Sequence, residues 1–361
     1  MNKPFSQLNH YRLLGHSGLR VSPLCLGTMT FGSDWGWGTD LEESRRILDF
    51  YAARGGNFID TANIYTNGSS ERFLGKLLQG RRDRFVLATK YSLNTDPTNP
   101  NAGGNHRRSL VRAVEDSLKR LETDYIDLYW LHVWDYRNSI EEVMRALDDL
   151  VRQGKILHIG LSDTPSWIVT EGLAIAKLRG WTPISAIQVH YNLVERTSEA
   201  DMLPMSRYHG ITPLAWSPLA GGVLSGKYTR EDLQNTSGEK EGSGRKGVTQ
   251  EIGQLTERSL QIADVVKQIT AEIGRSPSQV ALNWILQQPS KPIPIIGARK
   301  LSHLEDNLGA LDFALDREQI DRLNQVSAFV MPFPHNFIAL DMYHGLVDGE
   351  NRIEAGFTAY H

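Results

Sequence analysis

The sequence predicts an α/β protein built as a closed barrel, (β/α)8, in which each of eight parallel strands is followed by a helix. Two observations predict it. Short apolar runs alternate with longer amphipathic stretches from residue 24 onward, as expected for strands that are buried on both faces and covered by helices. The strand ends recur about every 26–42 residues, close to the roughly 30 residues per unit of a TIM barrel. A doubly wound open sheet would show the same alternation, but eight units in one register favour closure.

The strands and helices are expected at positions set by these patterns. The expected strands are residues 23–27, 57–60, 84–90, 125–132, 156–162, 186–191, 212–217 and 292–297. The expected helices are residues 41–55, 69–80, 107–122, 139–154, 164–180 and 198–210, many of which end in a glycine, a common helix stop.

Three segments lie outside this repeat. Residues 11–24, "YRLLGHSGLRVSPL", predict a β-hairpin that closes the amino-terminal mouth of the barrel. Residues 229–254 form a long loop rich in glycine and charge, followed by two more helices before the last strand. Residues 329–361 are expected to be an irregular tail rich in aromatic residues that covers the pocket. The whole chain, residues 1–361, is expected to be one domain.

Composition excludes several classes of protein. The formal net charge of −3 gives no reason to expect nucleic acid or an anionic membrane as a partner. Cys25 is the sole cysteine, so neither an intrachain disulfide nor a cysteine-rich metal site is possible, and no metal is expected. The amino-terminal residues lack the apolar core of a signal peptide, and no apolar run approaches the ~20 residues of a membrane span. We therefore expect a cytoplasmic protein.

One glycine motif is a coincidence. Residues 242–247 match G-x-G-x-x-G, the dinucleotide fingerprint. That motif requires a strand directly before it and a helix directly after it. Here the preceding residues are "NTSGEKE", so the match indicates a solvated loop and not a Rossmann unit.

Polar side chains gather where the expected strands end. Because the loops after the strands converge at one mouth of a barrel, these strand ends define the candidate site. Asp60, Lys90 and His132 each end a strand, and Tyr65 follows in the loop after the second strand. The remaining strand ends supply Gly27, Thr28, Ser162, Asp163, Gln188, Trp216, Ser217 and Gly297.

An acid, an ammonium, an imidazole and a phenol at one mouth suit the protonation of a carbonyl oxygen. A tyrosine titrates near pH 10, and a neighbouring ammonium favours its ionised form. Asp60 would keep Lys90 charged and in place, and His132 would orient the oxygen that receives the proton. Each residue alone has a structural alternative: Asp60 as a turn cap, Tyr65 as packing, Lys90 and His132 as ordinary strand ends.

Seven motifs together resemble the aldo-keto reductases. They are, in order, "DTANIY", "SSERFLGKLL", "TKY", "DYIDLYWLH", "GKILHIGLSD", "IQVHYN" and "WSPLAGGVLSGKY". The "SDTPSW" run and the helix "HRRSLVRAVEDSL" are most similar to the aryl-alcohol-dehydrogenase-like branch. The resemblance implies a barrel that binds NADPH without a Rossmann domain. It also implies Tyr65 as the general acid, Lys90 and Asp60 as its tuning pair, and His132 as the residue that orients the carbonyl.

The resemblance further implies a cofactor site along the mouth. Ser162, Asp163 and Gln188 would hold the nicotinamide carboxamide, and Trp216 would stack on its ring. Asp163 stands where most of the family has Asn, and a carboxylate cannot donate to the carboxamide oxygen. The other residues implied near the cofactor are Thr28, Met29, Ser217, Pro218, Leu219, Gly221, Lys227 and Gly297.

The adenosine end would lie at residues 297–307. Arg299 beside a helix N-terminus suits a 2′-phosphate, so NADPH is expected in preference to NADH. Asp306 and Asn307 match the family's adenine contacts, whereas His303 stands where Gln is usual. A plain surface cation is the alternative interpretation of Arg299.

Aromatic residues in the loops predict an apolar substrate pocket. The expected wall is Phe31, Trp35, Trp37, Tyr91 and Trp134. Such a wall suits a planar aldehyde or ketone, so the expected partner is a small carbonyl compound.

Two other functions remain open from the sequence. One is a regulatory module like the potassium-channel β-subunits, which hold the cofactor with little turnover; His132 stands where those typically have Asn. The other is a lyase with Lys90 as a Schiff-base amine, which needs a lowered lysine pKa. Asp60 nearby would have the opposite effect.

Overall fold

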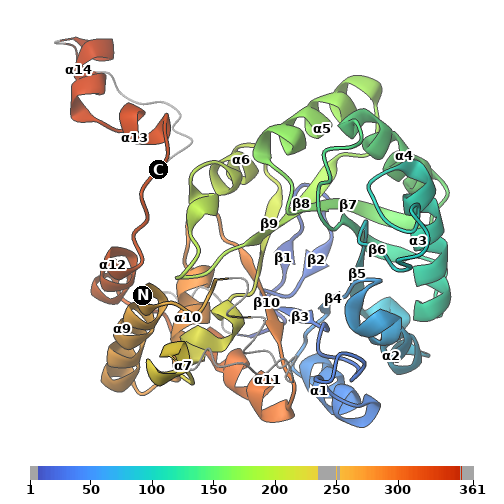
Figure 1. The fold of residues 1–361 in the computed structure, drawn as a ribbon, viewed down its shortest axis with the longest axis horizontal. Coiled ribbons are helices and arrows are strands. Elements are labelled where there is room, and N and C mark those ends of the chain that lie inside the picture. Colours follow the sequence, from blue (N-terminus) through green and yellow to red (C-terminus); the bar gives the residue numbers. More distant parts are fainter. Residues whose placement is uncertain (1–6, 235–248, 250–252, 350, 352–361) are drawn as a thin grey trace.

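The computed structural model describes residues 7–234, 249, 253–349 and 351, and its centre is a closed barrel of eight parallel strands (Figure 1). The strands follow one another round the barrel in chain order, and the last pairs with the first. They are β3 Cys25–Gly27, β4 Phe58–Asp60, β5 Val86–Tyr91, β6 Ile126–Leu131, β7 Ile156–Ser162, β8 Ile184–His190, β9 Thr212–Trp216 and β10 Ile293–Gly297. All eight expected strands are confirmed, and the open doubly wound sheet is excluded.

The helices surround the barrel (Figure 1). They are α1 Leu41–Ala53, α2 Ser69–Leu78, α3 Arg107–Leu121, α4 Ile140–Arg152, α5 Ser166–Arg179, α6 Met202–Tyr208, α7 Glu231–Gln234, α9 Glu257–Ile273, α10 Pro277–Leu286, α11 Leu301–Leu308 and α12 Arg317–Val326. Many begin at a side-chain cap that satisfies a free N–H group of the first turn. Asp40 caps α1, Ser139 caps α4, and Thr256 and Ser276 form capping boxes on α9 and α10.

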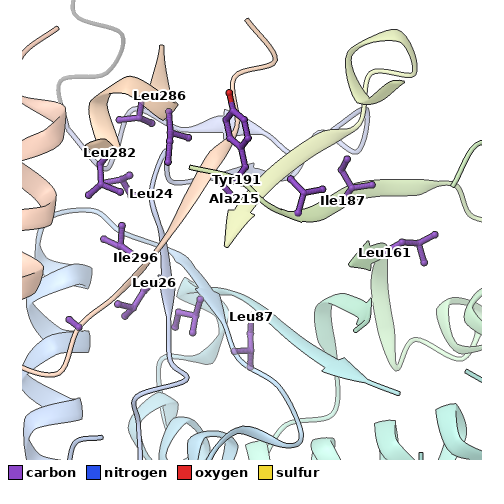
Figure 2. Packing of buried hydrophobic residues seen from close by; sticks show 14 of the residues in the cluster. Leu24, Leu26, Leu87, Leu161, Ile187, Tyr191, Ala215, Leu282, Leu286 and Ile296 are labelled. Carbon is purple, nitrogen blue, oxygen red and sulfur yellow. The ribbon is translucent and has the colours of Figure 1, made fainter. Parts of the chain in front are cut away.

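The core has two layers. The larger layer lies between the barrel and the helices, and Figure 2 shows members of it on strands β3, β5, β7, β8, β9 and β10 and on helix α10. The smaller layer lies inside the barrel. Its buried members are Leu14, Val21, Cys25, Phe58, Val86, Ala88, Leu128, Trp130, Ala186, Leu214, Ile293 and Ile295.

The amino-terminal hairpin closes one end of the barrel, as expected. Its strands are β1 Arg12–Leu13 and β2 Arg20–Val21. Leu14 and Val21 belong to the inner layer. The Gly15 N–H donates to the Thr212 hydroxyl at the start of β9 (2.7 Å). The opposite mouth, at the carboxyl ends of the strands, is therefore the one left for a site.

The carboxyl-terminal tail differs from the expectation of an irregular segment. It contains two short helices, α13 His335–Ile338 and α14 Asp341–Asp348, which lie away from the barrel in Figure 1. None of its described residues lines the pocket at the carboxyl ends of the strands, so the described tail does not cover that pocket.

Part of the long loop lies outside the described residues, including the glycine motif at 242–247. The described part of 229–254 consists of residues 229–234, which contain α7, with residues 249, 253 and 254. Among the described residues, no helix has the length and apolar character needed to cross a membrane.

Candidate active site

A cavity of about 500 Å³ opens at the carboxyl ends of the strands. Aromatic and aliphatic side chains form much of its wall, and polar groups lie at its base. Its lining residues are Gly27, Met29, Thr30, Trp35, Trp37, Asp60, Ile64, Tyr65, Leu93, His132, Ser162, Asp163, Gln188, Trp216, Ser217, Pro218, Leu219, Gly221, Thr249, Gln254, Ile295, Ile296 and Gly297.

Three ionisable groups from neighbouring segments meet under this cavity. Asp60 is the last residue of β4, and Lys90 lies near the end of β5, which pairs with β4. The Lys90 ammonium is fully buried and donates to the Asp60 carboxylate, to the Thr61 carbonyl (2.8 Å) and to the Tyr65 hydroxyl (3.2 Å). The ammonium also lies 4.8 Å from the centre of the Tyr65 ring. The structure thus brings the predicted acid, ammonium and phenol together.

A strained turn holds Tyr65 in this position. Thr66, Asn67 and Gly68 follow it with φ angles of 46°, 52° and 83°, a left-handed run that only glycine adopts readily. The buried Thr66 hydroxyl donates to the Phe31 carbonyl (2.7 Å) and accepts from the Ser70 N–H (3.1 Å). These contacts fix the turn, and with it the direction of the phenol.

Burial and the neighbouring charges shift the pKa values of Lys90 and Tyr65. Burial lowers the pKa of Lys90, but Asp60 and Tyr65 outweigh burial, so that pKa lies above its ordinary value. Burial raises the pKa of Tyr65, and the opposing effect of Lys90 does not cancel it. Lys90 acts on Tyr65 in the expected direction, and burial opposes it. Tyr65 is a neutral phenol at neutral pH, beside a cation that stabilises its phenolate.

The His132 ring contacts the Tyr65 ring. The two rings meet edge to face, with centroids 5.9 Å apart. Burial, and then the charge of Lys90, lower the pKa of His132 to about 3. Its buried Nδ1 has no hydrogen-bond partner among the described residues. His132 is therefore a neutral imidazole that lines the pocket.

The residues expected to hold a nicotinamide all line this pocket. Gln188 donates to the Asp60 carboxylate (3.0 Å), which links this group to the ionisable cluster. The buried Ser162 hydroxyl has no hydrogen-bond partner among the described residues, so it is free to bind a polar ligand group. Asp163 accepts from the Trp216 indole (2.9 Å), a role that its sequence position did not indicate.

Trp216 is held from two directions. Asp163 binds its indole N–H, and the His190 ring stacks on it with centroids 4.0 Å apart and planes 10° apart. Trp216 also lines the pocket. A flat ring at this position, fixed by two neighbours, provides a surface on which a second planar ring can stack.

Most of the other expected cofactor residues also line this pocket. Met29, Ser217, Pro218, Leu219, Gly221 and Gly297 do so. Thr28 does not: it is buried and its hydroxyl is bonded to the Asp60 carbonyl and to Ser70. Apart from its two chain neighbours, no described residue has an atom within 4 Å of where a Cβ of Gly297 would stand, so there is open space beside this backbone.

The expected adenosine end borders a second cavity, of about 490 Å³. Arg299 lines it together with Lys300 and Ser302 of the same segment. Burial and the charges of Arg299 and Lys300 lower the pKa of His303, and Lys227 acts in the same direction. The Asp306 carboxylate acts in the opposite direction and does not cancel them.

The two expected adenine contacts have protein neighbours in this structure. Asp306 accepts from the Gln279 amide through both its carboxylate and its carbonyl, each at 3.0 Å. Asn307 is buried. Both lie on α11, the helix that begins beside Arg299.

Three of the five expected substrate residues do not line the pocket. Trp35 and Trp37 do, and Trp35 meets Tyr65 edge to face with centroids 6.4 Å apart. Phe31, Tyr91 and Trp134 instead belong to the layer between barrel and helices. For Tyr91 the reason is strand alternation: Lys90 points into the barrel, so the next side chain points out.

Sequence reasoning did not identify several residues that line the cavity. Ile64 and Leu93 are apolar neighbours of Tyr65 and Tyr91, and only their proximity could have indicated them. Gln254, at the end of the long loop, contacts His190 Nε2 (2.6 Å) and the Ser217 hydroxyl (3.2 Å). Its position depends on folding over a long sequence separation, for which the sequence offers no local signal. Across the described residues, no cluster of three or more metal-ligating side chains occurs.

Comparison with known proteins agrees with this geometry. A family model described as "Aldo/keto reductase family" matches residues 23–328. A norsolorinic acid reductase from Aspergillus flavus is 37% identical over 347 residues, covering 93% of this chain and 86% of its own. An aryl-alcohol dehydrogenase from Phanerodontia chrysosporium, named for NADP(+), is 38% identical over 92% of this chain and 90% of its own. An aldo-keto reductase from Emericella nidulans, AusK, is 37% identical over 94% of this chain and 87% of its own.

Proposed function

Because the chain belongs to the aldo/keto reductase family, whose members are NAD(P)H-dependent oxidoreductases acting on carbonyl groups, we propose that it uses NADPH to reduce aromatic or small apolar aldehydes and ketones to alcohols. Tyr65 is the proton donor in this proposal. The observation that carries it is the continuous set of contacts from Gln188 through Asp60 and Lys90 to the Tyr65 hydroxyl.

The pocket fits the nicotinamide end of the cofactor. The free, buried Ser162 hydroxyl and the Gln188 side chain can bind the carboxamide, and the flat Trp216 ring can stack on the nicotinamide. When bound, the reduced nicotinamide supplies a hydride to the carbonyl carbon. The residues of the chain bind and orient it beside Tyr65.

Tyr65 supplies the proton that the carbonyl oxygen takes up. As a neutral phenol it carries that proton at neutral pH, and the phenolate it leaves is stabilised by the Lys90 ammonium 3.2 Å from its oxygen. Asp60 keeps Lys90 protonated and in place. The same pairing argues against a lyase, since a Schiff-base lysine must be an unprotonated amine.

His132 orients the substrate. As a neutral imidazole it can donate one hydrogen bond to the carbonyl oxygen without adding a charge. Such a bond polarises the carbonyl and aligns its oxygen with the Tyr65 hydroxyl.

The preference for NADPH is supported by the charges at the other end of the site. Arg299 and Lys300 line the second cavity, and Lys227 also lowers the pKa of His303. Clustered cations bind the additional phosphate of NADPH, which NADH lacks. A relative with 38% identity is named for NADP(+).

The preference for aromatic or apolar substrates is supported by the pocket wall. Trp35 packs on Tyr65 and Trp37 packs on Trp35, and Ile64 and Leu93 also line the pocket with apolar surface. A planar substrate can bury its ring against these side chains while its carbonyl faces Tyr65 and His132.

Replacing Tyr65 by Phe tests the proposal. We expect kcat for reduction of a nitrobenzaldehyde, followed by NADPH absorbance, to fall about a thousandfold, since general acid catalysis contributes about 10²–10⁴. The dissociation constant for NADPH, measured by fluorescence titration, should stay within about twofold, because the phenol's hydroxyl is not a cofactor contact in this scheme.

Tyr136→Phe is the matched control, because this tyrosine is 68% exposed in the loop after β6 and should not affect the rate. Equal rates for Tyr65→Phe and the parent would defeat the assignment of Tyr65. A parent chain that binds NADPH tightly and turns over no carbonyl compound would instead support the regulatory-module alternative.

A further inference from the structure

Two helices that lie far apart in the sequence meet at the second cavity. The first turn of α1 contributes Glu43, and α11 begins at Leu301. The Glu43 carboxylate accepts a hydrogen bond from the Leu301 N–H (2.7 Å). Lys300, the residue before α11, provides no side-chain cap for this helix. A carboxylate from another helix therefore caps α11.

Glu43 is held firmly in this position. Its carboxylate also pairs with Arg46, one turn further along α1. The side chain of Glu43 is 16% exposed, whereas that of Arg46 is 61% exposed. The carboxylate is thus partly shielded from water, and its partner is a solvated cation that neutralises it incompletely.

The same cavity holds the cations expected to receive a phosphate. Arg299 and Lys300 line it together with Glu43 and its partner Arg46. Neither Arg299 nor Lys300 forms an ion pair with any carboxylate that the structure describes. Asp40 adds a second carboxylate, which caps α1 through the Glu43 N–H (2.8 Å). Cationic and anionic groups therefore face one space.

We propose that Glu43 is a specificity-determining residue that weakens binding of a 2′-phosphorylated adenosine and so limits the preference for NADPH over NADH. This inference rests on the cofactor end proposed above. A phosphate beside Arg299 would meet the negative charge of Glu43, and it could not use the Leu301 N–H, which Glu43 already occupies. An adenosine with a free 2′-hydroxyl carries no charge there and is indifferent to Glu43.

Glu43→Gln tests this inference because glutamine keeps the cap and removes the charge. Its side-chain carbonyl can still accept from the Leu301 N–H. We expect the dissociation constant of 2′,5′-ADP, measured by calorimetry at low salt, to fall about three- to fivefold, the range of a partly screened charge interaction. The constant for 5′-AMP should stay within about twofold. At about 0.5 M salt the increase in affinity for 2′,5′-ADP should be smaller, since screening weakens the repulsion.

Glu42→Gln is the matched control. It removes the same charge one residue earlier on α1, from a side chain that is 74% exposed and 3.9 Å from Arg45. We expect it to leave both dissociation constants unchanged. A gain for 2′,5′-ADP as large as that of Glu43→Gln would show a general charge effect and overturn the inference.

A second variant guards against a folding defect in the first. Arg46 also lines the cavity, so Arg46→Gln removes one cation from it and leaves the Glu43 charge without its partner; we expect weaker binding of 2′,5′-ADP. In the Glu43→Gln background, Arg46→Gln should weaken the binding of 2′,5′-ADP by a smaller factor. An equal loss in both backgrounds would contradict a role for the Glu43 charge.

The remaining outcomes distinguish a failure of this inference from a failure of the proposed use of NADPH. If the parent chain binds both nucleotides but Glu43→Gln leaves the 2′,5′-ADP constant unchanged or raises it, the inference fails and the NADPH proposal stands. If the parent binds neither 2′,5′-ADP nor 5′-AMP at millimolar concentration, the cofactor proposal fails, and the inference fails with it.

Discussion

The same strands build two parts of the barrel interior that have opposite chemistry. One is the apolar inner layer, which includes Phe58 and Ala186 and is called the floor here. The other is the polar site at the carboxyl ends of the strands, which includes Asp60 and Gln188 and is called the rim. On β4, Phe58 lies in the apolar inner layer, and Asp60, two residues later on the same face, lies at the site. On β8, Ala186 belongs to the floor and Gln188 to the rim. Two residues of strand span about 6.6 Å, and over that distance the interior changes from a dry core to a charged cluster.

The difference separates what keeps the fold from what performs chemistry. The floor stabilises the barrel by burying apolar surface, a contribution that scales with area. The rim buries a charge pair, Asp60 and Lys90, and such pairs add little net stability because desolvation offsets their attraction. The contacts at the rim fix the position of a functional group instead. Hydrogen bonds to Asp60 and Thr61 hold the Lys90 ammonium where it also contacts the Tyr65 hydroxyl.

Phe58→Ala is the largest expected effect on the floor. Phe58 is fully buried inside the barrel, so its truncation should lower the free energy of unfolding by about 3–5 kcal/mol. Urea denaturation followed by circular dichroism measures this. At 25 °C the folded variant should keep kcat within about twofold, because strand pairing on both sides still places Asp60.

Leu178→Ala is the control for this truncation. Leu178 is 84% exposed on α5, so the loss should stay within about 0.5 kcal/mol. If Phe58→Ala were to lower kcat as strongly as it lowers stability, the floor and the rim would not be separable.

Trp35→Ala addresses the rim, with a smaller effect. Trp35 packs on Tyr65 and Trp37 and lines the pocket. We expect KM for a nitrobenzaldehyde to rise about two- to tenfold, the equivalent of the roughly 0.5–1.5 kcal/mol of an aromatic pair. KM for a short aliphatic aldehyde, which cannot reach this wall, should change little, and steady-state kinetics measures both.

Trp167→Ala is the matched control, since Trp167 is 60% exposed on α5 and lines no part of this pocket. The unfolding midpoint should be the same for both tryptophan variants. A rise in KM that is equal for aromatic and aliphatic aldehydes would assign Trp35 a structural role in place of a substrate contact.

The barrel could be predicted because its signals are local. Each strand is a short apolar run, each helix carries its own periodicity and stop, and the spacing of the units implies closure. The positions of Asp60, Lys90 and Tyr65 follow from where the strands end, so the sequence brought the same three residues together that the structure does.

The rest depends on geometry that the sequence does not express locally. Phe31 and Trp134 lie in loops, where no periodicity indicates which way a side chain points. Gln254 reaches His190 only through the fold. The direction of the Tyr65 pKa shift depends on the balance of burial against Lys90, and burial is a property of the folded molecule. The two short helices of the tail carry too few residues for a clear periodic signal.

One histidine at the rim and one beside the floor should make the stability of the fold depend on pH. This is the smallest of the expected effects. Burial lowers the pKa of His132 at the rim, to about 3, and also lowers the pKa of His158, which pairs in register with Leu128 of the floor. For both groups the folded pKa lies below the unfolded value near 6.5. Protons therefore bind the unfolded chain first, and stability falls as pH drops below about 6.5.

Each histidine variant should lessen this acid sensitivity, but only one should alter activity. We expect the fall in Tm between pH 7 and pH 4.5 to be smaller by roughly 1–3 °C in both His132→Gln and His158→Gln than in the parent. Since the parent's His132 stays neutral down to about pH 3, its kcat/KM should show no titration near pH 6.5. His132→Gln should lower kcat/KM at every pH and His158→Gln should not. A step near pH 6.5 that disappears only in His132→Gln would mean that the rim imidazole titrates like a solvated one, and that the rim is far wetter than its burial implies.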